Sequence, residues 1–292
     1  MGQIIACANQ KGGVGKTTTV VNLATDLGRV NQRVLVVDLD PQGNATSGFG
    51  IDRGALPSTM FDVILGDSRI AASILPTVAS GCWLAPASVA LAGAEVELAG
   101  VDQRERRLSR VLDEVRDDYD YILIDCPPSL GLLTVNALTA ADSVLIPTQC
   151  EYYALEGLSQ LIATLNLVRD NLNPRLAIKG VVLTMYDART NLSADVAAEV
   201  RNHLGASVFE TVIPRSVRLS EAPSFGLPIA LYRGDSRGAV AYDALAAELL
   251  RRDASGLVNA RPVGDAARST SSLGAGPAGA EERAAVATGA PS

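Results

Sequence analysis

The chain has 292 residues, of which 48% are hydrophobic and 20% are charged. This composition is typical of a soluble protein with room for one large α/β domain and a full core, and no apolar run approaches the ~18 residues that span a bilayer. The formal net charge of −7 argues against nucleic-acid binding by the surface as a whole, but it leaves open a local basic face.

A glycine-rich loop follows the first predicted strand. We expect a strand at 3–8 and a helix that begins near Thr18. Between them lies the segment Lys11-Gly12-Gly13-Val14-Gly15-Lys16-Thr17-Thr18. Strand, glycine-rich turn and helix are the context of a phosphate-binding loop, because glycines let backbone N–H groups face an anion at the positive end of the helix. Lys16 would reach the outer phosphates of a nucleotide, and the Thr17 hydroxyl would hold Mg²⁺.

This loop departs from the usual pattern G-x-x-x-x-G-K-[ST]. Gln10 occupies the position of the first glycine, and Lys11 adds a second lysine five residues before Lys16. An ordinary phosphate-binding loop has no need of that second lysine.

The rest of the chain alternates between apolar runs and segments of helical spacing. Strands are expected at 33–37, 82–86, 121–125, 143–149, 178–185 and 208–213, and helices within 58–75 and at 103–118, 132–141, 155–172, 194–204 and 238–252. Continuous apolar runs are typical of strands buried on both faces of a parallel sheet, joined by right-handed crossovers. The sequence therefore predicts a doubly wound, mostly parallel α/β sheet in a single domain, residues 1–252, followed by a disordered Ala/Gly/Ser/Pro-rich tail at 253–292.

Three aspartates follow two of these strands. Ligands of a doubly wound sheet bind beyond the carboxyl ends of its strands. Asp125 closes the apolar run 121–124 as a Walker B acid does, and we expect it to act on Mg²⁺ through a bound water or through Thr17. Asp40 is predicted to orient the water that attacks the nucleotide, because phosphoryl transfer depends mainly on positioning and charge. Asp38 is expected to support the loop and the metal shell.

The four cysteines form no C-x-x-C pair. Cys7 and Cys126 lie in or beside strand-like runs, so we expect buried, reduced thiols and a cytoplasmic compartment. No charged and apolar leader opens the chain, so no secretory signal is expected.

Taken together, these segments resemble the ParA/Soj group of deviant Walker ATPases. The resemblance covers roughly residues 1–250 and rests first on Lys11–Thr18, Val37–Asn44 and Ile122–Pro128. Further stretches of the chromosomal Soj type are 44–48, 91–95, 151–157, 187–191 and 217–224. The combination is specific to this group, whereas the loop alone indicates only the superfamily.

The resemblance implies an ATP- and Mg²⁺-dependent ATPase that partitions DNA, a function typical of chromosome segregation. Such proteins form an ATP-sandwich homodimer that binds double-stranded DNA without sequence preference. A centromere-binding partner of the ParB type stimulates hydrolysis and releases the dimer. The implied location is the cytoplasm, on the nucleoid, with no membrane association.

Individual residues take their implied roles from the same resemblance. Lys11 matches the signature lysine that reaches the phosphates bound by the other subunit, and Gly12 would face that subunit. Pro214 and Arg215 fall where the family contacts the nucleotide base. Arg189 and Arg218, in expected loops, match positions that bind DNA.

Three alternatives use the same loop. A MinD-like membrane-associated positioning ATPase would end in a basic amphipathic helix, whereas this chain ends in an Ala/Gly/Ser-rich segment. A nitrogenase-type iron protein would need two cysteines placed for a shared cluster, and neither Cys82 nor Cys126 lies in a loop of that kind. A module that binds nucleotide without hydrolysis is disfavoured by Asp40.

Overall fold

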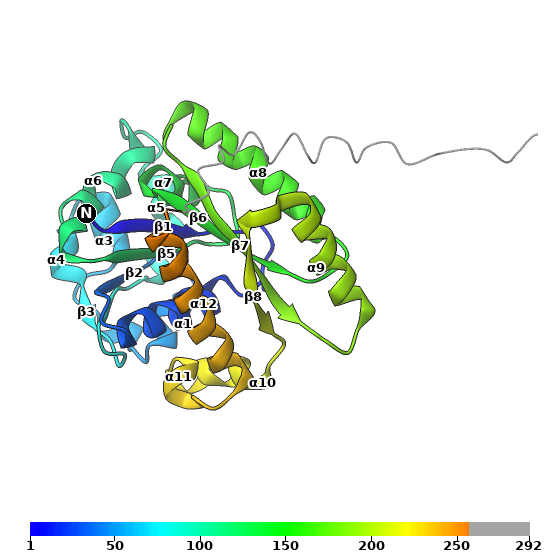
Figure 1. Ribbon diagram of the computed structural model, residues 1–292. Helices are drawn as coiled ribbons and strands as arrows, with labels where there is room; N and C mark the ends of the chain where they lie inside the picture. Colours follow the sequence, from blue (N-terminus) through cyan, green and yellow to red (C-terminus); the bar gives the residue numbers. More distant parts are fainter. Residues whose placement is uncertain (257–292) are drawn as a thin grey trace, which may run out of the picture.

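The computed structural model describes residues 1–256 and is organised around one eight-stranded sheet (Figure 1). The strand order is β3-β4-β2-β5-β1-β6-β7-β8. Only β3 runs antiparallel to its neighbour, so the predicted mostly parallel, doubly wound sheet is confirmed. The strands are β1 (Gln3–Cys7), β2 (Val34–Asp38), β3 (Leu75–Pro76), β4 (Cys82–Ala85), β5 (Tyr121–Asp125), β6 (Ser143–Gln149), β7 (Ala177–Tyr186) and β8 (Val208–Pro214).

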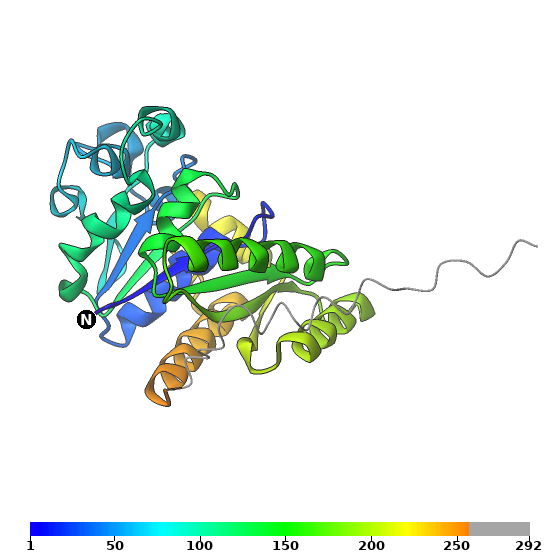
Figure 2. The same ribbon diagram turned by 90° about the horizontal axis from the view of Figure 1, so that it is seen from above.

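Helices cover both faces of this sheet (Figures 1 and 2). They are α1 (Lys16–Arg29), α2 (Asn44–Gly48), α3 (Met60–Leu65), α4 (Ile70–Ser73), α5 (Ala94–Glu97), α6 (Arg107–Asp113), α7 (Leu132–Ala140), α8 (Ala154–Asn171), α9 (Asn191–Leu204), α10 (Val217–Glu221), α11 (Ile229–Tyr232) and α12 (Arg237–Ala254). One core holds buried residues of α3, α6, α7, α8 and α9, and the other holds those of α1 and α12.

The central strands show why continuous apolar runs predict such a sheet. Every residue of β2 is buried. Leu35 and Val37 pack into one core, whereas Val34 and Val36 pack into the other. Successive side chains of a strand point to opposite faces, so a strand covered on both sides must be apolar at each position. The same alternation divides β1 between the two cores.

Several predicted boundaries differ from the structure. Helix α1 begins at Lys16, and the helix expected at 103–118 is the shorter α6, flanked by 3₁₀ turns at Arg104–Arg106 and Arg116–Asp118. Arg218, expected in a loop, lies on the short helix α10, and the short helix α2 was not predicted at all. Helices of five residues are too short to show an apolar period, which explains why these were missed.

The last helix also ends slightly later than predicted. Helix α12 continues to Ala254, two residues past the expected boundary at Arg252. The rest of the predicted tail, residues 257–292, lies outside the described residues. No helix within residues 1–256 is long and apolar enough to cross a membrane. All four cysteines are free and buried, as expected for Cys7 and Cys126.

Candidate nucleotide site

The glycine-rich loop connects β1, the strand between β5 and β6, to helix α1. Gly13 and Gly15 have φ of 75° and 89°, a left-handed conformation in which L side chains are strained. A hydrogen bond connects the loop to the sheet, since the Thr184 hydroxyl on β7 donates to the Val14 carbonyl oxygen over 2.8 Å. The sequence therefore forms a curled loop at the start of a helix, as a phosphate-binding site requires.

The two lysines of the loop lie in different environments. Lys16 is 7% exposed, and its Nζ donates to the Lys11 carbonyl oxygen over 3.3 Å, so its ammonium group lies across the loop. The Lys11 side chain is 48% exposed and pairs with Glu151, with Nζ 2.6 Å from Oε2. Lys16 is thus an internal group of the loop, whereas Lys11 lies at its outer edge.

Asp125 is a fully buried carboxylate at the end of β5. Within residues 1–256 neither of its oxygens accepts a hydrogen bond. Burial raises its pKa well above the ordinary value, and the negative charge of Asp38 adds to the rise, while the nearby Thr17 opposes it. A buried acid without a partner beside Thr17 fits a site for Mg²⁺ or a Mg²⁺-bound water, because a cation would compensate its charge.

Asp38 lies beside Asp125 in the register of β2 and β5. Its carboxylate accepts hydrogen bonds from the Thr46 N–H (2.8 Å), the Thr46 hydroxyl (2.7 Å) and the Asp40 N–H (3.2 Å). Burial raises the pKa of Asp38 to about 6, and the hydrogen bonds from Thr46 oppose that rise. Asp38 therefore holds the loop after β2 and the start of α2 in place, and its predicted support of a metal shell stays a prediction.

Asp40 is 7% exposed and faces the same cavity as the glycine-rich loop. Its Oδ1 accepts the N–H of Gln42 over 2.9 Å, so the side chain also closes the turn after β2. This turn fixes the carboxylate beside the loop, where a group that orients a water molecule would have to lie.

A cavity of about 450 Å³ lies between the glycine-rich loop and Asp40, and neither Asp38 nor Asp125 lines it. Its lining includes every predicted loop residue from Gly12 to Thr18 except the buried Val14, together with Asp40, Asn44 and Pro128. An adjoining cavity of about 270 Å³ is lined by Pro214 and Arg215 and shares Gly15, Thr18, Met185, Leu219 and Pro223 with the first. The residues expected to contact the phosphates and those expected to contact the base of a nucleotide thus line two adjoining cavities. Arg189 and Arg218 line neither of them.

Some lining residues were missed from the sequence. Met185 lines both cavities and is a non-glycine residue with a φ of 51°. Asn22 donates to the Thr18 carbonyl oxygen over 2.7 Å and accepts the N–H of Ile229 over 2.7 Å, which joins α1 to α11 at the cavity wall. The positive φ of Met185 and the long-range contact of Asn22 are tertiary features with no local sequence signal.

Comparison with known proteins places the chain in a family. A family model described as an AAA domain matches residues 2–178. The sporulation initiation inhibitor protein Soj of Bacillus subtilis is 57% identical over 249 residues, covering 85% of this chain and 98% of the relative. The chromosome partitioning protein ParA of Myxococcus xanthus is 54% identical over 253 residues, with 87% and 89% of the two chains covered. The chain belongs to the ParA/Soj family.

A solved structure agrees with this membership. Cobyrinic acid a,c-diamide synthase from Mycobacterium smegmatis, with a bound ATP analogue and magnesium, superimposes with a TM-score of 0.77 at 41% identity and covers 88% of this chain and 97% of its own. The predicted family and fold are therefore confirmed, and the ParA/Soj fold of this chain is shared with a protein that binds an ATP analogue and magnesium.

Proposed function

We propose that this ParA/Soj chain is a Mg²⁺-dependent ATPase whose ATP-bound homodimer binds double-stranded DNA without sequence preference and partitions chromosomes. A ParB-type partner stimulates hydrolysis, and hydrolysis releases the dimer from the nucleoid. The observation that carries the ATPase part is the buried Asp125 carboxylate beside Thr17 of the phosphate-shaped loop, since its oxygens accept no hydrogen bond from the described part of the chain.

Binding of the nucleotide uses the loop and the two cavities. The backbone N–H groups from Gly13 to Thr18 and the Lys16 ammonium take the phosphates. The Thr17 hydroxyl and, through water, Asp125 would hold Mg²⁺, which would neutralise part of the phosphate charge. Pro214 and Arg215, in the adjoining cavity, contact the base.

Hydrolysis needs one group that aligns a water molecule with the outermost phosphate. Asp40 supplies that group, because its carboxylate faces the main cavity and its position is fixed by the turn to Gln42. Asp38 keeps this turn in place through the N–H of Asp40. Positioning of the nucleophile is the main contribution that a protein makes to phosphoryl transfer.

Dimerisation involves Lys11 and Gly12. A Cβ at Gly12 would meet no atom of the described chain within 4 Å, so this glycine is not required by its own subunit. Lys11 is paired with Glu151 of its own chain, and action on the partner's phosphates requires that pair to separate. Charge supplied in trans stabilises the transition state of hydrolysis.

DNA binding is assigned to Arg189 and Arg218. Both side chains are exposed, at 86% and 49%. The dimer doubles the number of phosphate contacts, so that ATP controls DNA affinity through assembly.

Phosphate release from Mg²⁺-ATP tests the proposal. The wild-type protein should release phosphate slowly, and faster when DNA and a ParB-type protein are present. Asp40→Ala should bind ATP and dimerise but release phosphate at least about a hundredfold more slowly. Wild-type turnover in Asp40→Ala would show that the carboxylate has another role.

A further inference from the structure

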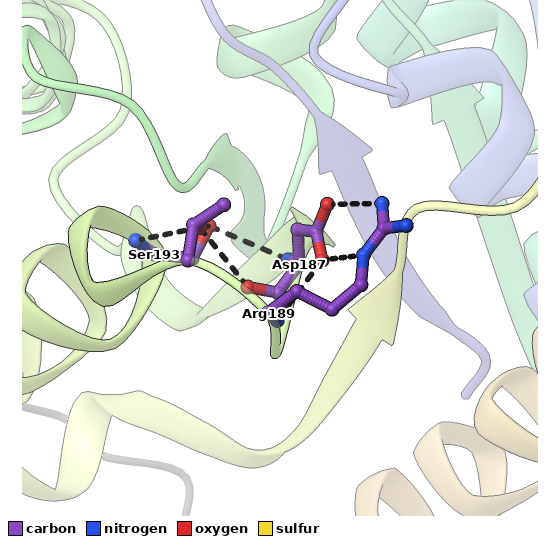
Figure 3. A network of polar contacts seen from close by, with 4 residues as sticks. Asp187, Arg189 and Ser193 are labelled. Carbon is purple, nitrogen blue, oxygen red and sulfur yellow. Dashed lines mark hydrogen bonds and ion pairs between the residues drawn. The ribbon is translucent and has the colours of Figure 1, made fainter.

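Both arginines assigned to DNA are paired with a carboxylate of their own chain. The guanidinium of Arg189 turns back onto Asp187, with Nη2 2.7 Å from Oδ2 and Nε 2.9 Å from Oδ1 (Figure 3). On α10, Nη1 of Arg218 lies 2.7 Å from Oε2 of Glu221. Two of the guanidinium nitrogens of Arg189 and one of Arg218 therefore already donate to a carboxylate that a DNA phosphate would have to replace.

Asp187 is held in position by hydrogen bonds at both its carboxylate and its own N–H. Its Oδ1 also accepts the N–H of Arg189 over 3.0 Å, and the Asp187 N–H donates to Oγ of Ser193 over 3.3 Å (Figure 3). The hydrogen bond from Arg189 keeps the pKa of Asp187 well below its ordinary value, so the acid remains charged at neutral pH. The competing acceptor is therefore a fixed part of the turn.

The two ion pairs belong to the same edge of the sheet. Asp187 follows β7, and α10 follows β8, which is parallel to β7 with Tyr186 opposite Pro214. The N–H of Arg215 donates to the Tyr186 carbonyl oxygen over 3.0 Å, which joins the two connections where they leave the sheet. Both pairs therefore lie in connections that leave the carboxyl ends of two neighbouring strands, where we expect one DNA duplex to contact them.

We propose that Asp187 and Glu221 are internal competitors of DNA phosphate that set the DNA affinity of each subunit. This inference rests on the proposed DNA-binding role of Arg189 and Arg218. A carboxylate and a phosphate take the same guanidinium donors, so contact with DNA requires exchange of one for the other. The exchange lowers the net binding free energy that each arginine contributes, so a single subunit binds DNA weakly. The dimer has twice the contacts and therefore binds DNA more tightly.

Asp187→Asn tests this with the turn preserved, because an asparagine Oδ1 can still accept the N–H of Arg189. An exposed ion pair is weak, so its removal should tighten DNA binding about two- to fivefold per subunit. The measurement is the fluorescence anisotropy of a labelled random-sequence duplex titrated with the full-length chain, ATP and Mg²⁺. Asp195→Asn is the matched control, since Asp195 lies exposed on α9 and forms no ion pair within residues 1–256.

The expected result is tighter binding by Asp187→Asn than by Asp195→Asn, with the gain lost when Arg189→Ala is added. Glu221→Gln should tighten binding in the same way through Arg218. Equal or weaker DNA binding by Asp187→Asn would overturn the inference and show that Asp187 positions Arg189. A gain in DNA affinity that persists when Arg189→Ala is added would also overturn it and show a general effect of charge. If Arg189→Ala alone leaves binding unchanged, the DNA-binding assignment itself fails, which separates the two outcomes.

Discussion

Gly12→Val separates the role of the loop in its own subunit from its role in the dimer. A side chain at Gly12 meets no atom of the described chain within 4 Å, and its φ lies outside the left-handed region occupied by Gly13 and Gly15. The free energy of unfolding of the monomer should therefore change by less than about 0.5 kcal/mol. ATP binding by the monomer should be retained.

The dimer should respond very differently. If Gly12 faces the partner subunit, the added side chain overpacks the interface at a cost of about 1–3 kcal/mol. A two-fold dimer contains the substitution twice, so the total is about 2–6 kcal/mol, or at least about a thirtyfold loss of dimer affinity.

Light scattering on a sizing column, with a non-hydrolysable ATP analogue and Mg²⁺, measures the effect. Gly13→Val is the comparison, because the φ of 75° at Gly13 makes any L side chain costly by about 1–2 kcal/mol in the monomer itself. Gly12→Val should lower dimerisation without loss of stability, whereas Gly13→Val should lower stability. A Gly12→Val protein that dimerises with wild-type affinity would refute the placement of this glycine at the interface.

Two further substitutions test buried charges. Asp125→Asn should unfold at an equal or higher urea concentration than the wild type, because it removes a buried carboxylate whose oxygens accept no hydrogen bond within residues 1–256, yet it should lose Mg²⁺-dependent phosphate release. A clear loss of stability would show instead that Lys16 and Thr17, which favour its charged form, compensate the buried carboxylate. Burial raises the pKa of Asp26 from 3.8 to about 6 despite its hydrogen bond from Arg29. Between these two values the native state holds a proton that the unfolded state has lost, so the free energy of unfolding falls as the pH rises. The free energy of unfolding of Asp26→Asn, measured with urea, should therefore exceed that of the wild type by a margin that grows by about 2 kcal/mol from about pH 4 to pH 7. A margin independent of pH would contradict the shift.

The parts of the fold predicted most accurately are those encoded by contiguous residues. A strand buried on both faces must be apolar throughout, so β2 and β5 could be recognised from their own residues. The phosphate loop is equally local, because its glycines, Lys16 and Thr17 follow one another. Asp125 could be placed beside it since parallel strands end at one edge of the sheet.

The features that escaped prediction depend on residues far apart in the chain. Glu151, which pairs with Lys11, is 140 positions away, and no spacing rule connects them. The short helix α10 has five residues, which is less than two turns, so its apolar residues cannot show a helical period. The pair of Asp187 and Arg189 is close in sequence, but its bidentate geometry depends on the turn after β7.

The central claim is that ATP controls DNA binding through a dimer completed by Lys11. The direct measurement is retardation of random-sequence DNA by the wild-type chain and by Lys11→Ala, each with ATP, with ADP and without nucleotide. The account predicts retardation by the wild-type protein with ATP alone, and none by Lys11→Ala under any of the three conditions. Retardation that is independent of nucleotide, or that survives in Lys11→Ala, would contradict it.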